Sequence, residues 1–199
     1  MAAPFLAAAP PSPLALQVPG TAHPGDPARD ERLQAAVEQN YDFVWRTLRH
    51  LGCHDAAASD CAQQVMCVLA RHFDRVAPGA LPSFLYQTAV RVASTFRRGV
   101  RRRPESTGID LDELPGHGAD ADELVDELRK RALLQRLLDG MSFELRVVFV
   151  LHEIEELSSP EVASILGVPA NTVSSRLRRA REQFHRRAQQ LRARFDGGG

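Results

Sequence analysis

Apolar side chains recur at steps of three or four residues along most of the chain after residue 29, which is the spacing of helices that bury one face. The first such stretch ends at Gly52, the second covers residues 61–76, and the third covers residues 81–103. No run of alternating apolar and polar residues suggests a strand. The pattern predicts an all-α fold.

Residues 104–121 interrupt this pattern, because they are rich in proline, glycine and acidic side chains. The helical spacing resumes at residue 122 and continues to residue 196. We therefore expect two small helical bundles, residues 29–103 and 122–196, joined by a flexible acidic linker. Residues 1–28 are rich in alanine and proline and lack the basic start of a signal peptide, so we expect a disordered tail.

Residues 157–184 have the spacing of a helix-turn-helix. Ser158 and Glu161 match a capping box at the start of a short helix. Gly167 permits a left-handed turn, and Pro169 can begin a longer helix. The C-terminal bundle is therefore predicted to be a helix-turn-helix domain.

The second helix of this motif places Val173 and Leu177 on an apolar stripe and presents polar side chains on the opposite side. Short polar groups near a helix N-terminus can approach base edges in a major groove, and arginines can grip phosphates or bind guanine. A solvated basic helix is the alternative, but the turn and the capped helix before it favour DNA binding. The candidate DNA-binding residues are Asn171, Thr172, Ser174, Ser175, Arg176, Arg178 and Arg179.

Charge is balanced overall, with 25 basic and 25 acidic residues, but it is distributed in blocks. Residues 29–103 contain 12 basic and 7 acidic residues, residues 104–128 contain 9 acidic and no basic ones, and residues 171–195 contain 8 arginines and one acid. Two basic blocks separated by an acidic stretch suggest two contacts with a polyanion. The acidic stretch can equally be a plain solubilising linker.

The three cysteines show no repeated CxxC spacing, so we expect no disulfide scaffold and a cytoplasmic location. Possible zinc ligands are His50, Cys53, His54 and Cys61. Gly52 interrupts the helix between the two histidines and Cys61 falls on the apolar stripe, which favours buried free thiols. We expect no metal, no cofactor and no catalytic residues, and no membrane span, because no apolar stretch of about 18 residues is present.

The helix-turn-helix resembles region 4 of bacterial sigma factors, the promoter-specificity subunits of RNA polymerase. The TV-x-SR-x-x-RAR core of that region is present as Thr172-Val173, Ser175-Arg176 and Arg179-Ala180-Arg181. Residues 41–76 and 84–103 resemble sigma region 2. Two such regions joined by an acidic linker look like the extracytoplasmic-function (ECF) group of sigma factors.

This resemblance implies partners for particular residues. In the family a D-x-x-Q-[EQ] sequence docks on the clamp of the polymerase β′ subunit; Asp60, Gln63 and Gln64 match it here, and Arg71 shares their polar face. The helix over residues 81–103 would recognise and melt −10 promoter DNA, and the helix-turn-helix would bind the −35 element. The candidate −10 residues are Phe84, Arg91, Arg97, Arg98, Arg101 and Arg102. The β flap of the polymerase and an anti-sigma factor are further implied partners.

Four positions depart from the family pattern. Phe84 stands where the family usually has tryptophan, Arg91 and Thr95 where many members have asparagine and aspartate, and Ser174 where lysine is frequent. Because these positions touch or support the DNA-reading surfaces, the family's promoter sequence does not transfer to this chain. A stand-alone helix-turn-helix regulator is the alternative function, and the polymerase-docking residues of the first bundle distinguish the two.

Overall fold

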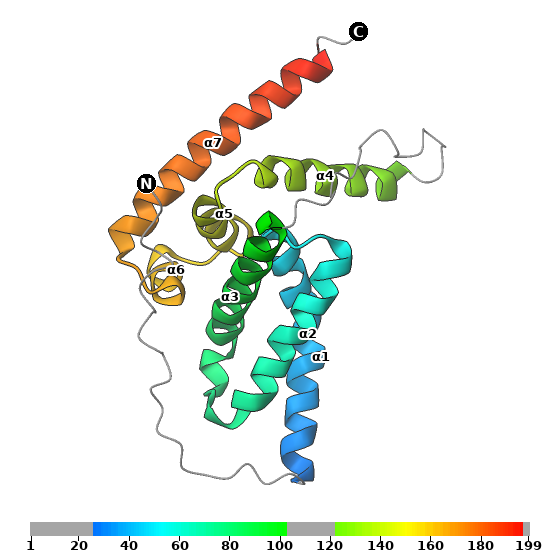
Figure 1. Ribbon diagram of the computed structural model, residues 1–199, viewed down its shortest axis with the longest axis vertical. Coiled ribbons are helices and arrows are strands. Elements are labelled where there is room, and N and C mark those ends of the chain that lie inside the picture. Colours follow the sequence, from blue (N-terminus) through cyan, green and yellow to red (C-terminus); the bar gives the residue numbers. More distant parts are fainter. Residues whose placement is uncertain (1–25, 103–121, 197–199) are drawn as a thin grey trace.

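The computed structural model describes residues 26–102 and 122–196, and every regular element in these ranges is a helix (Figure 1). The first half contains α1 (Pro27–His50), α2 (Asp55–His72), the short turns η2 (Phe73–Arg75) and η3 (Pro78–Ala80), and α3 (Leu81–Arg102). The second half contains α4 (Asp122–Asp139), α5 (Phe143–Phe149), η5 (Val150–Ile154), α6 (Ser159–Leu166) and α7 (Ala170–Asp196). The predicted all-α class is confirmed. The expected linker, residues 104–121, and residues 1–25 of the expected tail lie outside the described residues, but the prediction of a disordered tail up to residue 28 is wrong at its end, because Asp26 caps α1 and Pro27 begins it.

Local sequence signals set the ends of the first helix. Asp26 is the N-cap residue, and its carboxylate accepts a hydrogen bond of 3.1 Å from the Ala28 amide. Pro27 occupies the first turn, where its missing N–H costs no helical bond. At the other end Gly52 adopts a φ of 100°, which side chains disfavour, and the chain reverses into α2.

The second helix is shorter than its apolar spacing indicates. The pattern continues to Val76, yet α2 ends at His72 and Val76 is extended. Pro78 disfavours helical backbone at the residue before it, and Gly79 has a low helix propensity. The chain therefore passes through two 3₁₀ turns before α3 begins.

The buried apolar residues of both halves form one continuous core, although the sequence indicates two bundles on a flexible tether. Leu48 and Leu85 from the first half and Leu151 and Val162 from the second are completely buried in it. Helices α3 and α6 pack directly against each other, which brings the helix-turn-helix alongside the first bundle (Figure 1). Burying each such side chain stabilises the fold by roughly 1.5–3 kcal/mol.

Candidate nucleic-acid and protein interfaces

The four candidate polymerase-docking residues lie together on one face of α2. At roughly 100° of rotation per residue, Asp60, Gln63, Gln64 and Arg71 fall within an arc of roughly 100°. All four are exposed, whereas Cys61, Val65 and Leu69 on the other side are buried in the core. The structure thus brings together the set that the sequence singled out, as a polar strip that we call the α2 strip.

Helix α3 presents a second exposed face. Phe84, Arg91 and Arg98 are spaced by seven residues, so they point in nearly the same direction, with Thr95 beside them. Arg91 and Arg98 are exposed, and Arg98 donates a 3.2 Å hydrogen bond to the Thr95 hydroxyl. Phe84 is half-buried, with its ring centroid 6.3 Å from that of His72. We call these four residues the α3 face. Arg101 and Arg102 belong to the same helix, but their side chains lie outside the described residues.

Arg97 does not belong to the α3 face. Its guanidinium carbon lies 5.5 Å from the ring centroid of Phe143, at the start of α5 in the second half. The side chain is half-buried there, in a geometry typical of a cation–π contact. Among the candidate −10 residues with described side chains, Arg97 is therefore the one that the structure turns toward the other half.

The helix-turn-helix is built as its sequence indicates. Ser158 and Glu161 form the capping box, with a 2.8 Å bond from the Ser158 amide to the Glu161 carboxylate. Hydrogen bonds from the Ser158 amide and hydroxyl lower the pKa of Glu161. Gly167 has a φ of 64°, and α7 begins at Ala170, right after Pro169. These local signals set the direction of α7 relative to α6.

Most of the candidate −35 residues lie on the outer side of α7. Asn171, Ser174, Ser175, Arg178 and Arg179 are exposed, and Val173, Leu177 and Ala180 on the opposite side are buried. The Ser174 and Ser175 hydroxyls bond to carbonyls of their own helix, at 3.1 and 3.0 Å. Thr172 and Arg176 are half-buried at the flanks. We call the five exposed residues the α7 face.

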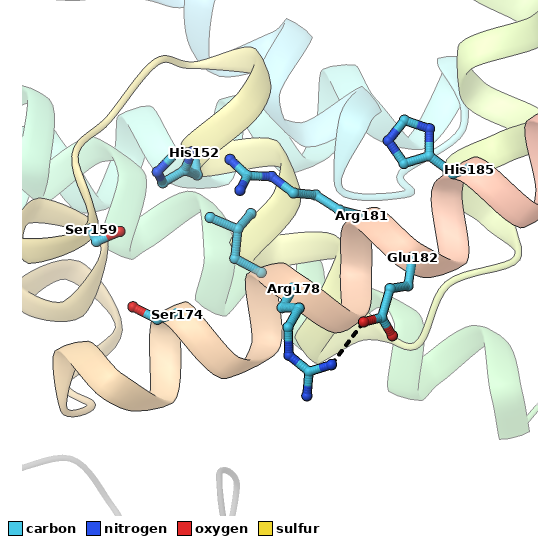
Figure 2. A pocket seen from close by; sticks show the side chains of 8 residues that line it. His152, Ser159, Ser174, Arg178, Arg181, Glu182 and His185 are labelled. Carbon is cyan, nitrogen blue, oxygen red and sulfur yellow. Dashed lines mark hydrogen bonds and ion pairs between the residues drawn. The ribbon is translucent and has the colours of Figure 1, made fainter.

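A shallow pocket opens beside the α7 face, between α7, the start of α6 and the η5 turn (Figure 2). Arg181 is held on one wall by two bonds to Glu153, of 2.9 and 2.6 Å. Arg178 binds Glu182 at 2.7 Å on the other side. Each of these two arginines is thus paired with one carboxylate, and His152 and His185 complete the pocket lining. Sequence reasoning placed Arg181 in a motif but did not identify it as part of a pocket wall.

The sequence also left unassigned a set of polar contacts that join the two halves. Glu155, at the end of η5, accepts hydrogen bonds from the Thr47 hydroxyl at 2.9 Å and from the Tyr86 hydroxyl at 3.0 Å. The Nδ1 atom of His50 lies 3.9 Å from the same carboxylate, beyond hydrogen-bond distance. Burial raises the pKa of Glu155, but His50 and the two hydroxyls outweigh it, so the net pKa lies below the usual value.

Arg146 of α5 makes the second such contact, and its side chain is completely buried. It donates a hydrogen bond to the His50 carbonyl and lies 3.5 Å from the Arg49 carbonyl, at the C-terminal end of α1. It also binds Asp139 at 2.7 Å. Burial lowers the pKa of the Arg146 guanidinium, and Asp139 opposes this shift. Gln135 of α4 adds a 3.1 Å bond to the Arg49 carbonyl.

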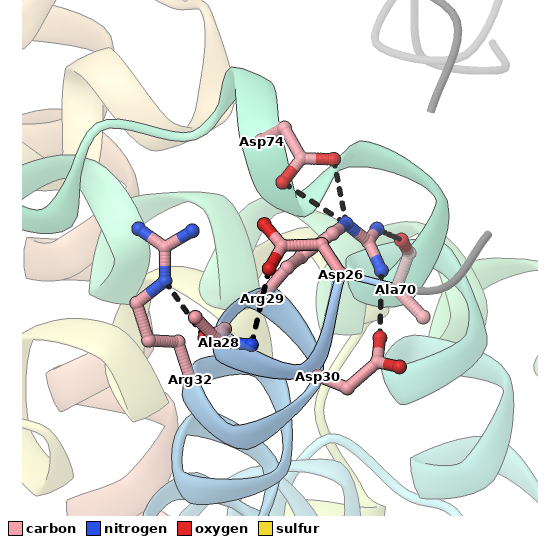
Figure 3. A network of polar contacts seen from close by, with 7 residues as sticks. All are labelled: Asp26, Ala28, Arg29, Asp30, Arg32, Ala70 and Asp74. Atoms are coloured by element: carbon pink, nitrogen blue, oxygen red, sulfur yellow. Dashed lines mark hydrogen bonds and ion pairs between the residues drawn. The ribbon is translucent and has the colours of Figure 1, made fainter. Parts of the chain in front are cut away.

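A third polar network ties the start of α1 to the end of α2 (Figure 3). The Arg29 guanidinium binds the Asp74 carboxylate at 2.8 and 3.1 Å and donates to the Ala70 carbonyl at 3.1 Å. The hydrogen bond and the negative charge of Asp74 raise the pKa of Arg29, and Asp30 adds to the effect. Asp74 lies in the η2 turn that leads to α3, so the network braces the base of the loop before the α3 face.

We expect Arg29→Ala to loosen both ends of this brace. Amide hydrogen exchange is expected to quicken in the first turn of α1 and around the η2 turn, and to stay unchanged in α7, because α7 packs mainly on α4, α5 and α6. Arg32→Ala is the matched control, since Arg32 donates to the Ala28 carbonyl of its own helix. Equal exchange rates in the two variants would show that Arg29 does not brace the loop.

The positions of Cys53 and Cys61 agree with their interpretation as core residues. Cys53 and Cys61 are buried free thiols in contact with each other, and Cys67 is a free thiol on the surface. In the described residues, no cluster of three or more histidine, cysteine or acidic side chains is placed to hold a metal ion. The helices in these same ranges are all too short or too polar to cross a bilayer.

Comparison with known proteins identifies both halves. Residues 36–103 match the family described as Sigma-70 region 2, and residues 131–184 match Sigma-70, region 4. The first match contains the α2 strip and the α3 face, and the second contains the helix-turn-helix. Arg29 lies outside both matched ranges.

Curated relatives carry the same two regions. The ECF RNA polymerase sigma factor SigE of Mycolicibacterium smegmatis is 31% identical over 161 residues, which cover 80% of this chain and 63% of SigE. The ECF RNA polymerase sigma-E factor of Escherichia coli (strain K12) is 31% identical over 120 residues, which cover 56% of this chain and 63% of that protein. The chain thus spans less than two thirds of the length of these relatives.

Two solved structures share the fold. CnrH, in complex with the cytosolic domain of CnrY, superposes with a TM-score of 0.57 at 19% identity, covering 85% of this chain and 91% of CnrH. The sigma factor RpoE, in complex with the anti-sigma factor NepR from Bartonella quintana, gives 0.57 at 19% identity, covering 78% of this chain and 96% of RpoE. With regions 2 and 4 both matched, in this order and on these helices, the chain belongs to the sigma-70 family, as a sigma factor of the ECF type.

Proposed function

We propose that this chain directs core RNA polymerase to specific promoters and initiates transcription, by recognising and melting −10 DNA and by binding −35 DNA in the major groove. The observation that carries the proposal is the presence of both sigma regions in one chain, each with its predicted binding residues mostly exposed on a single helix face. A helix-turn-helix regulator that works alone has no need for the α2 strip.

Each surface takes one role in this proposal. The α2 strip docks on the β′ clamp, the α3 face binds the −10 element, and the α7 face enters the major groove of the −35 element, where arginines can bind guanine or phosphate. The β flap contacts the second half. The factor itself is non-catalytic, needs no cofactor, and acts in the cytoplasm, where the polymerase is.

An anti-sigma factor is part of the same proposal. The structures of similar fold contain CnrH with the cytosolic domain of CnrY and RpoE with the anti-sigma factor NepR. A chain of the same fold with large exposed binding faces can be regulated by a protein that covers them.

The decisive experiment mixes the purified chain with core RNA polymerase and tests for a co-migrating complex that starts transcription at a defined promoter. Gln63→Ala/Gln64→Ala is expected to weaken the complex about tenfold or more, because interfaces depend on a few central residues. Gln34→Ala is the matched control, since Gln34 is an exposed glutamine on α1 that is bonded to Glu38 and does not belong to the α2 strip. DNA binding without any polymerase complex would instead establish the stand-alone regulator.

A further inference from the structure

The two halves meet at the C-terminal end of α1 through groups that carry charge. The last carbonyls of a helix have no partner within it and form the negative end of its dipole. Here Arg146 and Gln135 of the second half donate to the Arg49 and His50 carbonyls. A guanidinium from one half thus caps a helix of the other half, where its charge is favourable.

Glu155 makes the complementary contact. Its carboxylate receives one hydroxyl from α1 and one from α3, so it binds two helices of the first half at once. Buried polar groups that are satisfied in one geometry are left unsatisfied in others, which selects that geometry. Arg146 and Glu155 together therefore act as a latch that holds the halves in one arrangement.

In this arrangement of the halves, one candidate DNA-binding side chain contacts the other half, whereas other candidate binding surfaces stay exposed. Arg97 lies over Phe143 of the second half, and its guanidinium shares the space above Gly52 with that of Arg146. The two like charges repel each other there, and a side chain at position 52 would meet both. The α2 strip and the α7 face remain exposed.

We propose that the halves form a latched closed state that can dock on polymerase but withholds Arg97 from DNA, so that docking precedes opening. DNA phosphates would compete with Phe143 for Arg97, relieve the repulsion above Gly52 and favour the open state. The proposal rests on the proposed function for the role of Arg97, whereas the latch rests on the contacts between the halves alone.

The latch is tested by energy transfer within the full chain. One dye is attached to Cys67, which is exposed, and the other to Gln190→Cys on the exposed part of α7; Cys53 and Cys61 are buried under native conditions. The chain without polymerase is expected in one high-transfer state, and Glu155→Ala is expected to add a low-transfer population. Glu156→Ala, one residue along at an exposed carboxylate, is the matched control and is expected to match the unsubstituted chain. Unchanged transfer in both Glu155→Ala and Arg146→Met would overturn the latch.

The order of events is tested on the same variants with core polymerase and a promoter that the unsubstituted holoenzyme transcribes. Glu155→Ala is expected to bind core polymerase within twofold of the unsubstituted chain, because the α2 strip is already exposed. It is expected to form promoter complexes several-fold more readily, and Arg97→Ala in the same background is expected to cancel the gain.

Two contrary outcomes would contradict different parts of the proposal. If Glu155→Ala also raised the affinity for core polymerase, the proposed order of docking before opening would be wrong, because the closed state would then hide the α2 strip as well. Absence of any polymerase complex, with energy transfer still responding to Glu155→Ala, would overturn the proposed function and the role of Arg97 while the latch stands.

Discussion

Leu48→Ala is expected to lower the free energy of unfolding of the whole chain by about 2–5 kcal/mol, the cost of truncating a large buried aliphatic side chain. Leu48 is fully buried at the end of α1, within the core that both halves share. The lost transfer energy adds to the cost of a cavity that rigid neighbouring helices cannot close. A loss of this size is a large share of the stability of a small protein.

Urea denaturation measures this loss and also tests whether the core is continuous. Trp45 is the only tryptophan, so its fluorescence reports on α1, while far-ultraviolet circular dichroism reports on helices of both halves. Because the halves share a core, both signals are expected to move to the same lower midpoint. Val100→Ala, at an exposed site on α3, is the control and is expected to change stability by about 0.5 kcal/mol or less. A fluorescence midpoint that shifts alone would show that the halves unfold independently.

The helices and the helix-turn-helix could be predicted because their signals are local. Apolar spacing, the capping box of Ser158 and Glu161, and the left-handed Gly167 each depend on residues within one or two turns. The α2 strip was predictable for the same reason, since residues three, four and eleven apart share a face of any helix. The end of α2 was misplaced because Val76 continues the apolar spacing even though Pro78 changes the backbone before it.

The contacts between the halves were not predictable from such signals. Arg146 interrupts the apolar run LRVVFVL, which marks a buried cation, but its carbonyl partner lies 96 residues earlier in the chain. Glu155 is one of three neighbouring acids, and only the fold distinguishes it from Glu153 and Glu156. The π-helical η5 turn that sets its direction has no sequence signature that periodicity detects.

Arg97 shows how charge alone misleads. It stands beside Arg98 in a basic run, and a count of charges groups the two together. Adjacent residues on a helix point about 100° apart, however, so only Arg98 joins the α3 face. The angle of each residue about the helix axis, counted from Phe84, therefore distinguishes Arg97 from Arg98 without knowledge of any tertiary contact.

Arg178→Ala is expected to weaken binding of −35 DNA by about 1–3 kcal/mol, which is the discrimination that a bidentate contact between arginine and a base edge supplies. The Arg178 side chain is 70% exposed on the α7 face, next to Ser174. Its 2.7 Å pair with Glu182 is an exposed (i, i+4) pair, worth only about 0.3–0.5 kcal/mol, so it can be exchanged for a base. The measurement is a titration of a −35 duplex against a scrambled duplex at one salt concentration, because phosphate contacts alone make affinity depend on salt.

Three variants separate base reading from charge. Arg178→Lys keeps the charge but not the planar pair of donors, so it is expected to lose preference for the −35 duplex and to keep most binding to the scrambled one. Arg179→Ala is expected to weaken both duplexes alike, as the loss of a phosphate contact does. Glu182→Gln removes the competing carboxylate and is expected to leave the preference intact. An Arg178→Ala variant with unchanged affinity at matched salt would remove Arg178 from the −35 interface, and the choice of promoter would then have to depend on Ser174 and Asn171 at the N-terminal end of α7.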